Sequence, residues 1–240
     1  MKGRGWHNES QRHRMSAYGV KTGNMGASGK KLVARAYSDF LIDEIVEDDL
    51  RLRVYQDDDN SNDPMGWDNL GTIATWHRNY QLGNMQPGGD PQEFLDELEE
   101  EYGDNLVILP VYMYDHSGIT INTSGYSCSW DSGQLGYIYV TPDEIIKEYG
   151  KLDNESKKKA RAVLEAEIEI YDHHIRGNVY NFTLEKRDSC KEYKHDDWEI
   201  IDSVGGFIGD FKDNYNGMKD HIPPEAENMF KRMMKEGDLY

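Results

Sequence analysis

Two stretches of the sequence decide the fold. Residues 106–114 read LVILPVYMY, and residues 134–144 read QLGYIYVTPDE. The first is the most apolar run of the chain and predicts a buried strand, in which Pro110 indicates a bulge or a sheet edge. The second predicts a strand that ends at Val140. A helix then starts, because Thr141 can cap it, Pro142 suits its first position, and the acidic pair that follows suits the positive end of the helix dipole.

Working outward, the same patterns predict the remaining elements. Glu155–Ile175 is the strongest helix, since its apolar residues recur at helical spacing and Gly177 follows as a stop signal. Further helices are predicted at Pro91–Tyr102 and Pro224–Lys235, and strands at Arg51–Gln56, Val179–Glu185 and Trp198–Ser203. Strands and helices do not alternate strictly, which favours an α+β fold over a doubly wound one. We predict a mixed or antiparallel sheet packed with three to four helices.

Charge is distributed unevenly along the 240 residues, which carry a formal net charge of −18. Residues 1–36 hold eight Lys and Arg against one Glu, and they are rich in Gly. They predict a basic, flexible N-terminal arm, and residues 37–240 predict one acidic α+β domain. Such an arm can contact nucleic acid through phosphates, or it can lie on its own acidic domain. Both interpretations stay open.

Several classes of protein are disfavoured. No apolar run approaches the roughly 20 residues of a membrane span, and the N-terminus lacks the apolar region of a secretory signal. The two cysteines, Cys128 and Cys190, are too few for a disulfide scaffold or a four-cysteine zinc site. We therefore expect a cytoplasmic protein without membrane contact.

One acidic loop has the spacing of a cation site. Asp57, Asp59, Ser61 and Asp63 occupy positions 1, 3, 5 and 7 of a calcium-type loop. The usual Gly is missing, because Asn62 stands at position 6, and Asp68 stands where a longer Glu is usual. A solvated acidic loop is favoured over a metal site, and no cofactor is expected.

Candidate catalytic residues follow the apolar strand. Asp115 and His116 come directly after it, and Cys128 and Asp131 lie in the next loop. His116 with Asp115, or Cys128 with His116, can form a nucleophile–base pair, and His77 is a further possible base. These residues define the hypothesis of a His/Asp-dependent hydrolase centred on Asp115 and His116. The Asp-Ser-Gly triplet at residues 131–133 also occurs around some serine nucleophiles, for which His77 or His116 could act as base, but a turn that leads into the next strand is the favoured explanation.

Several motifs resemble a family of accessory proteins from bacteriophages and plasmids. They are WDNLGT at residues 67–72 with WHRNYQLG at 76–83, LPVYMYDHSG at 109–118 and SCSWDSGQLGYIYV at 127–140. The resemblance covers residues 51–213. It departs from the family at Gly205-Gly206, where a Cys-Trp pair is expected, so no obligatory nucleophile lies there. It implies an accessory gene of a mobile element and brings no particular activity with it.

This context and the acidity suggest a function. Accessory proteins of mobile elements often act against host defence, and an acidic body is steered toward basic nucleic-acid channels. We predict a non-enzymatic inhibitor that binds a CRISPR effector, a restriction enzyme or another nucleic-acid-binding protein of a bacterial host. The expected partner-binding residues are Asp57, Asp58, Asp59, Asp63, Glu97, Glu99, Glu100 and Glu101. The alternatives are a binding accessory of phage replication or packaging, and the hydrolase above.

Overall fold

The computed structural model describes residues 40–57, 63–187, 198–211 and 217–236. Within these ranges the chain forms two four-stranded sheets, of order β1-β2-β7-β8 and β3-β6-β4-β5, and four α-helices. The strand pairs of defined register within the two sheets are antiparallel. The predicted α+β class is therefore confirmed, with the strands divided between two sheets.

The chain divides into two compact units. Unit 1 comprises Met1–Asp57, Tyr180–Phe207 and Gly217–Tyr240, and unit 2 comprises Asp58–Val179 and Ile208–Asn216. In the sequence, most of unit 2 thus lies between the first and second segments of unit 1. The expected end of the basic arm at residue 36 lies outside the described residues and stays a prediction. We predict one acidic domain over residues 37–240, whereas the contacts within the chain form two compact units.

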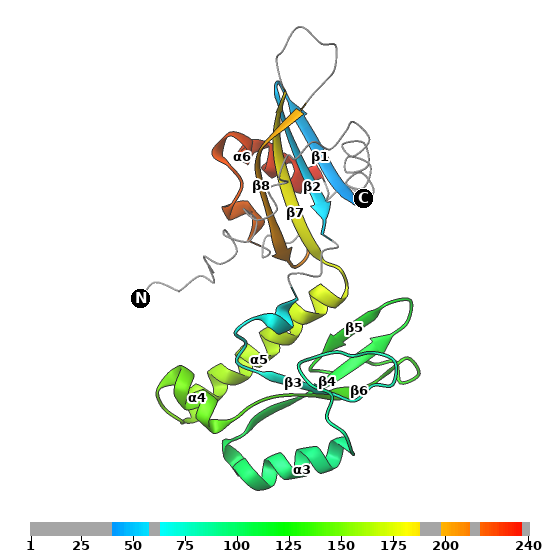
Figure 1. The fold of residues 1–240 in the computed structure, drawn as a ribbon, viewed down its shortest axis with the longest axis vertical. Coiled ribbons are helices and arrows are strands. Elements are labelled where there is room, and N and C mark those ends of the chain that lie inside the picture. Colours follow the sequence, from blue (N-terminus) through cyan, green and yellow to red (C-terminus); the bar gives the residue numbers. More distant parts are fainter. Residues whose placement is uncertain (1–39, 58–62, 188–197, 212–216, 237–240) are drawn as a thin grey trace, which may run out of the picture. The chain divides into compact units, whose positions relative to one another are not determined.

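Unit 1 is a four-stranded sheet with one helix against it (Figure 1). Its strands are β1 (Leu41–Glu47), β2 (Leu50–Gln56), β7 (Val179–Arg187) and β8 (Trp198–Ile208), followed by the short helices η6 (Met218–Asp220) and η7 (Pro224–Ala226) and by α6 (Glu227–Glu236). Leu52 and Val54 of β2 are fully buried, as are Phe182 and Leu184 of β7. On α6, Met229, Phe230 and Met233 are buried. These side chains form the apolar interior of unit 1.

Unit 2 places helices on both faces of its sheet (Figure 1). Its elements are η3 (Pro64–Gly66), β3 (Thr72–Thr75), α3 (Pro91–Tyr102), η4 (Gly103–Asn105), β4 (Val107–Asp115), β5 (Ile119–Asn122), β6 (Ser132–Val140), α4 (Pro142–Tyr149) and α5 (Asn154–Ile175). Leu164 and Ile168 of α5 join the same buried cluster as Ile138 of β6. On α3, Phe94 packs its ring edge-on against Trp76, at 5.2 Å, and Tyr139, at 5.9 Å. Because Ile138 and Tyr139 are neighbours on a strand, the two helices cover opposite faces.

The predicted helix signals are confirmed where they are local. Thr141 caps α4, as predicted, in a reciprocal capping box with Glu144; α5 has a similar box between Asp153 and Ser156, which was not predicted. Of the predicted stripe on α5, Ala160, Leu164, Ile168 and Tyr171 are buried and Ile175 is partly buried. Gly177 follows the helix with a φ of 74°, a left-handed conformation that glycine adopts without strain.

The prediction for Pro110 holds locally. Strand β4 as a whole lies inside the sheet, between β6 and β5. The pairing with β6 shifts register between Val111 and Tyr112, directly after the proline. Because β5 pairs only with residues 112–115, Pro110 has a neighbouring strand on one side only, which tolerates the missing N–H. Strands β1, β3 and β5 were not predicted.

Candidate functional site

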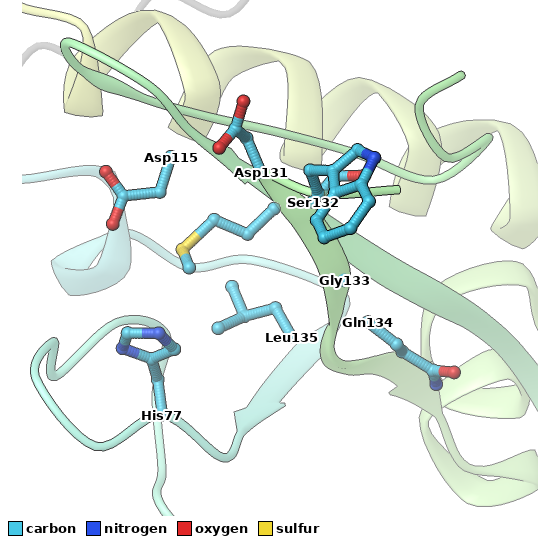
Figure 2. A pocket seen from close by; sticks show the side chains of 9 residues that line it. His77, Asp115, Asp131, Ser132, Gly133, Gln134 and Leu135 are labelled. Carbon is cyan, nitrogen blue, oxygen red and sulfur yellow. The ribbon is translucent and has the colours of Figure 1, made fainter. Parts of the chain in front are cut away.

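An open hollow of about 330 Å³ lies at one end of the unit 2 sheet (Figure 2). Its walls come from the loop after β3, from the end of β4 and from the start of β6. The residues that line it are His77, Met113, Asp115, Trp130, Asp131, Ser132, Gly133, Gln134 and Leu135. Met113 and Leu135 are buried and form its apolar part. The end of β4 and the start of β6 are far apart in the sequence, and they meet at the hollow because the two strands pair.

The first carboxylate of the hollow, Asp115, is the last residue of β4. Its backbone N–H donates to the carbonyl of Asp131 at 2.8 Å, which joins the two loops. The hydroxyl of Tyr80 donates to Asp115 Oδ2 at 3.1 Å. This hydrogen bond raises the pKa of Tyr80, since ionisation would place two negative charges together. The Asp115 carboxylate is thus held by a neutral donor.

The second carboxylate, Asp131, contacts two of the other predicted residues. His116 Nδ1 lies 3.3 Å from Asp131 Oδ2, and Cys128 Sγ lies 3.8 Å from the same oxygen. The Ser132 hydroxyl donates to the carbonyl of Cys128 and closes this turn. The structure therefore brings Asp115, His116, Cys128 and Asp131 together.

The arrangement differs from the nucleophile–base pairs considered from the sequence. The thiol of Cys128 faces Asp131, and the partner of His116 is Asp131, while the Asp115 carboxylate accepts from Tyr80. In a catalytic triad the base lies between the nucleophile and the group that orients the base. Here a carboxylate lies between the thiol and the imidazole, which is a different order. The His116 side chain is also 61% exposed. The geometry orients polar groups at the rim of the hollow, which suits binding.

His77 faces the hollow from the β3 side (Figure 2). Its Nδ1 accepts from the backbone N–H groups of Asn79, at 3.2 Å, and Tyr80, at 3.3 Å. The neutral ring therefore carries its proton on Nε2. The ring also stacks on Tyr80 with centroids 4.9 Å apart. Loop contacts thus fix both His77 and the Tyr80 hydroxyl that holds Asp115.

The predicted partner-binding carboxylates of α3 form an exposed acidic face. Glu97, Glu99, Glu100 and Glu101 are exposed, as are the neighbouring acids Glu93 and Asp96. None of these six forms an ion pair with a residue in the described ranges. Tyr102 hydrogen-bonds to Glu101, which raises the pKa of the tyrosine. The outer face of α3 therefore carries negative charges that no described Lys or Arg neutralises.

On α5, by contrast, acids and bases neutralise one another. Lys159 pairs with Glu155 at 2.7 Å and Arg161 pairs with Glu165 at 3.3 Å, one turn apart. At the start of the helix, Lys151 lies 2.7 Å from the cap residue Asp153. Charges of both signs are thus interspersed on α5, unlike on the outer face of α3.

The other acidic cluster is only partly described. Asp58, Asp59 and Ser61 lie outside the described residues, so the calcium-type loop stays untested as a metal site. Asp63 accepts from the backbone N–H of Met65 at 2.9 Å and starts the short helix η3. Part of this cluster thus serves the local fold, and α3 is the better candidate for a partner-binding surface.

A simple signal for this region was missed in the sequence. From Asn79 to Ile146 the chain has no Lys or Arg, although it has twelve Asp and Glu. This segment includes α3, β4, β5 and β6 and nearly the whole wall of the hollow. Trp130 lies within the motif at residues 127–140, and nothing in its sequence context indicated a binding residue. In the structure Trp130 is 94% exposed.

No protein-family model, curated protein or solved structure matches this chain. Among the helices of the described residues, none has the length and apolarity needed to cross a bilayer. The mobile-element resemblance therefore remains a prediction from sequence motifs.

Proposed function

We propose that this protein is an accessory protein of a mobile genetic element that inhibits a nucleic-acid-targeting defence enzyme, a CRISPR effector or a restriction enzyme, by binding its basic nucleic-acid surface. One observation carries the proposal: the exposed α3 face holds six carboxylates that no described cation neutralises. The resemblance to phage and plasmid proteins supplies the biological context.

The charge chemistry supports this partner class. Enzymes that bind nucleic acid hold phosphates with Lys and Arg, so their channels attract any dense row of negative charge. Glu93, Glu97 and Glu100 lie about one helical turn apart, roughly 4.5–6 Å along the axis. Carboxylates at such intervals can pair with successive Arg and Lys through charge-assisted hydrogen bonds.

The paired charges of α5 argue against solubility as the complete explanation. On the exposed face of α5, Lys and Arg lie one helical turn from Glu and neutralise its charge. Between residues 79 and 146 the chain places no Lys or Arg. A surface kept free of cations suits electrostatic steering toward a basic partner.

A cleavage assay with charge-reversed variants tests the proposal. A purified Cas9-type effector and a purified restriction endonuclease cleave plasmid DNA while this protein is titrated in at low and moderate salt. We expect inhibition of at least one enzyme that weakens as salt rises. The double variant Glu97→Lys/Glu100→Lys should lose at least tenfold in potency and show a flatter salt dependence. Lys is a good helix former, and position 100 lies in the last turn, where the helix dipole favours a cation, so α3 should persist.

The matched control changes the same charge elsewhere. Glu148→Lys/Glu169→Lys alters two exposed acids of α4 and α5 and should inhibit nearly as well as the wild-type chain. Equal loss in both double variants would reduce the effect to net charge. Absence of inhibition by the wild-type protein, in vitro and in plasmid transformation of cells that carry these systems, would refute the proposed function.

A further inference from the structure

The hollow has a chemistry that the acidic face of α3 does not share. It combines two carboxylates, Asp115 and Asp131, with the ring of Trp130 and an apolar base, and its described lining contains no Lys or Arg. Trp130 is 94% exposed, the highest value among the large apolar residues of the described chain. A tryptophan left in water beside a hollow has lost the free energy that burial would supply, which is typical of a binding residue.

Both carboxylates are oriented before any ligand arrives. Tyr80 holds Asp115 through Oδ2, while His116 and Cys128 contact Oδ2 of Asp131. The second oxygen of each carboxylate has no hydrogen-bond partner among the described residues. Exposed polar contacts of this kind add little to stability, so a fixed geometry here is better explained by recognition.

These features select one ligand class. A guanidinium is planar, carries five N–H donors that match carboxylate oxygens, and stacks on tryptophan. Phosphate and other anions would be repelled by the two carboxylates, and no Lys or Arg of the described residues lines the hollow to attract them. The volume of about 330 Å³ admits one side chain and its backbone.

We propose that the hollow is a binding site for an arginine side chain of a partner protein, with Asp115 and Asp131 accepting from the guanidinium and Trp130 covering its face. The source of that arginine rests on the proposed function, because arginine is a residue with which nucleic-acid enzymes hold phosphates. The acidic face of α3 then provides long-range attraction, and the hollow provides a specific anchor.

A titration with small peptides tests the site without any defence enzyme. Acetyl-Gly-Arg-Gly-amide is added to the isotope-labelled full chain, with the citrulline peptide as the isosteric neutral control and the lysine peptide as a second cation. The indole N–H of Trp130, assigned by its loss in Trp130→Phe, and the backbone N–H of Asp131 report binding. We expect saturable shifts with the arginine peptide, at least tenfold weaker binding of citrulline, and intermediate binding of lysine.

Variants separate the hollow from general acidity. Asp131→Asn and Trp130→Ala should weaken arginine binding at least tenfold, Trp130→Phe should retain part of it, and Glu148→Gln should leave it unchanged. The remaining resonances of each variant show whether unit 2 is still folded. Shifts that do not saturate, that are equal for citrulline, or that spread along α3 instead would overturn the site.

The same variants distinguish failure of this inference from failure of the proposed function. Arginine binding without inhibition of any nuclease would support the arginine site and refute the proposed function. Inhibition that persists unchanged in Trp130→Ala, with no arginine binding by the wild-type chain, leaves the function and removes the site.

Discussion

At the scale of single residues, two glycines of the sequence motifs have packing reasons. A Cβ on Gly136 would lie 2.0 Å from the carbonyl oxygen of Ala74 in the adjacent strand β3. A Cβ on Gly71 would lie 2.5 Å from Leu164 of α5 and 2.8 Å from Ile138. At Gly136 the obstacle is fixed backbone, whereas at Gly71 it consists of side-chain ends that can shift. Gly136 is therefore needed for the fold, whatever the function.

Substitution of Gly136 by Ala should destabilise unit 2 by about 2 kcal/mol or more, because a fixed backbone oxygen must move. Denaturant unfolding measures the loss. Gly133→Ala in the same strand is the control, since no atom lies within 4 Å of the added methyl group. Similar losses in the two variants would show that the close approach is not the cause.

Glu167 supports the WDNLGT motif from α5. Its carboxylate accepts from the N–H of Leu70 at 2.7 Å and of Gly71 at 2.9 Å. Burial raises the pKa of Glu167 above its ordinary value of 4.5, and the two hydrogen bonds only partly offset the shift. The folded state therefore binds this proton more tightly than the unfolded state does.

The raised pKa of Glu167 predicts a direction of pH dependence. Between the unfolded-state and folded-state pKa values the folded chain holds more protons, so its free energy of unfolding falls as pH rises. The wild-type chain should therefore lose stability relative to Glu167→Gln as pH increases above 4.5. Thermal unfolding of both proteins across this range measures the difference. A wild-type chain that gains stability relative to Glu167→Gln as pH rises would contradict the assignment.

At the scale of elements, α5 shows how local chemistry defines a helix. Asp153 accepts from the N–H of Ser156 at 2.8 Å, and the Ser156 hydroxyl accepts from the N–H of Asp153 at 2.9 Å. Lys151 lies 2.7 Å from the same carboxylate. This ion pair, with the backbone hydrogen bond from Ser156, lowers the pKa of Asp153 to about 2. The start of α5 is thus stabilised by an ionised cap.

Removal of this cap should lower the melting temperature of unit 2. Asp153→Ala loses both the cap and the ion pair, whereas Asp153→Asn keeps a capping oxygen and should lose less. Because the folded-state pKa of Asp153 is depressed, the ionised carboxylate contributes its full stabilisation of the folded state above pH 3.8. This stabilisation is lost as the pH falls through about 2. Wild-type and Asn melting temperatures should therefore converge at low pH. An unchanged gap would contradict the charge contribution.

At the scale of the whole molecule, the insertion of unit 2 into unit 1 divides the apolar interior. The buried cluster around Ile138 and Leu164 belongs to unit 2, and the buried residues of β2, β7 and α6 belong to unit 1. Each sheet forms its strand pairs within its own set of four. Local stability can therefore differ between the units.

Hydrogen exchange read by mass spectrometry tests this division. In Gly136→Ala, amides of β4 and β6 should exchange faster, because the damaged strand pairing lies in their sheet. Amides of β2 and β7 should keep the protection that they have in the wild-type chain. Equal acceleration in both sheets would show a single cooperative structure.

The sequence predicted best what neighbouring residues decide. Helix α3 was predicted with its observed bounds, and the cap of α4 and the buried stripe of α5 were also correct. Capping and helical spacing act over three or four residues, so they can be identified without knowing the fold. Strands β3 and β5 were missed because each has only four residues and little pattern of its own. Strand β1 was missed because charges interrupt its apolar residues.

By itself, the sequence determined the α+β class, most helices and the acidity that suggests a basic partner. Only the tertiary structure decided the division into two sheets, the partners of Asp131 and the meeting of Asp115 with Trp130 at one hollow. These depend on which strands pair and in which register, and pairing is fixed by contacts across long stretches of chain. The candidate residues could thus be named from the sequence, while their arrangement required the fold.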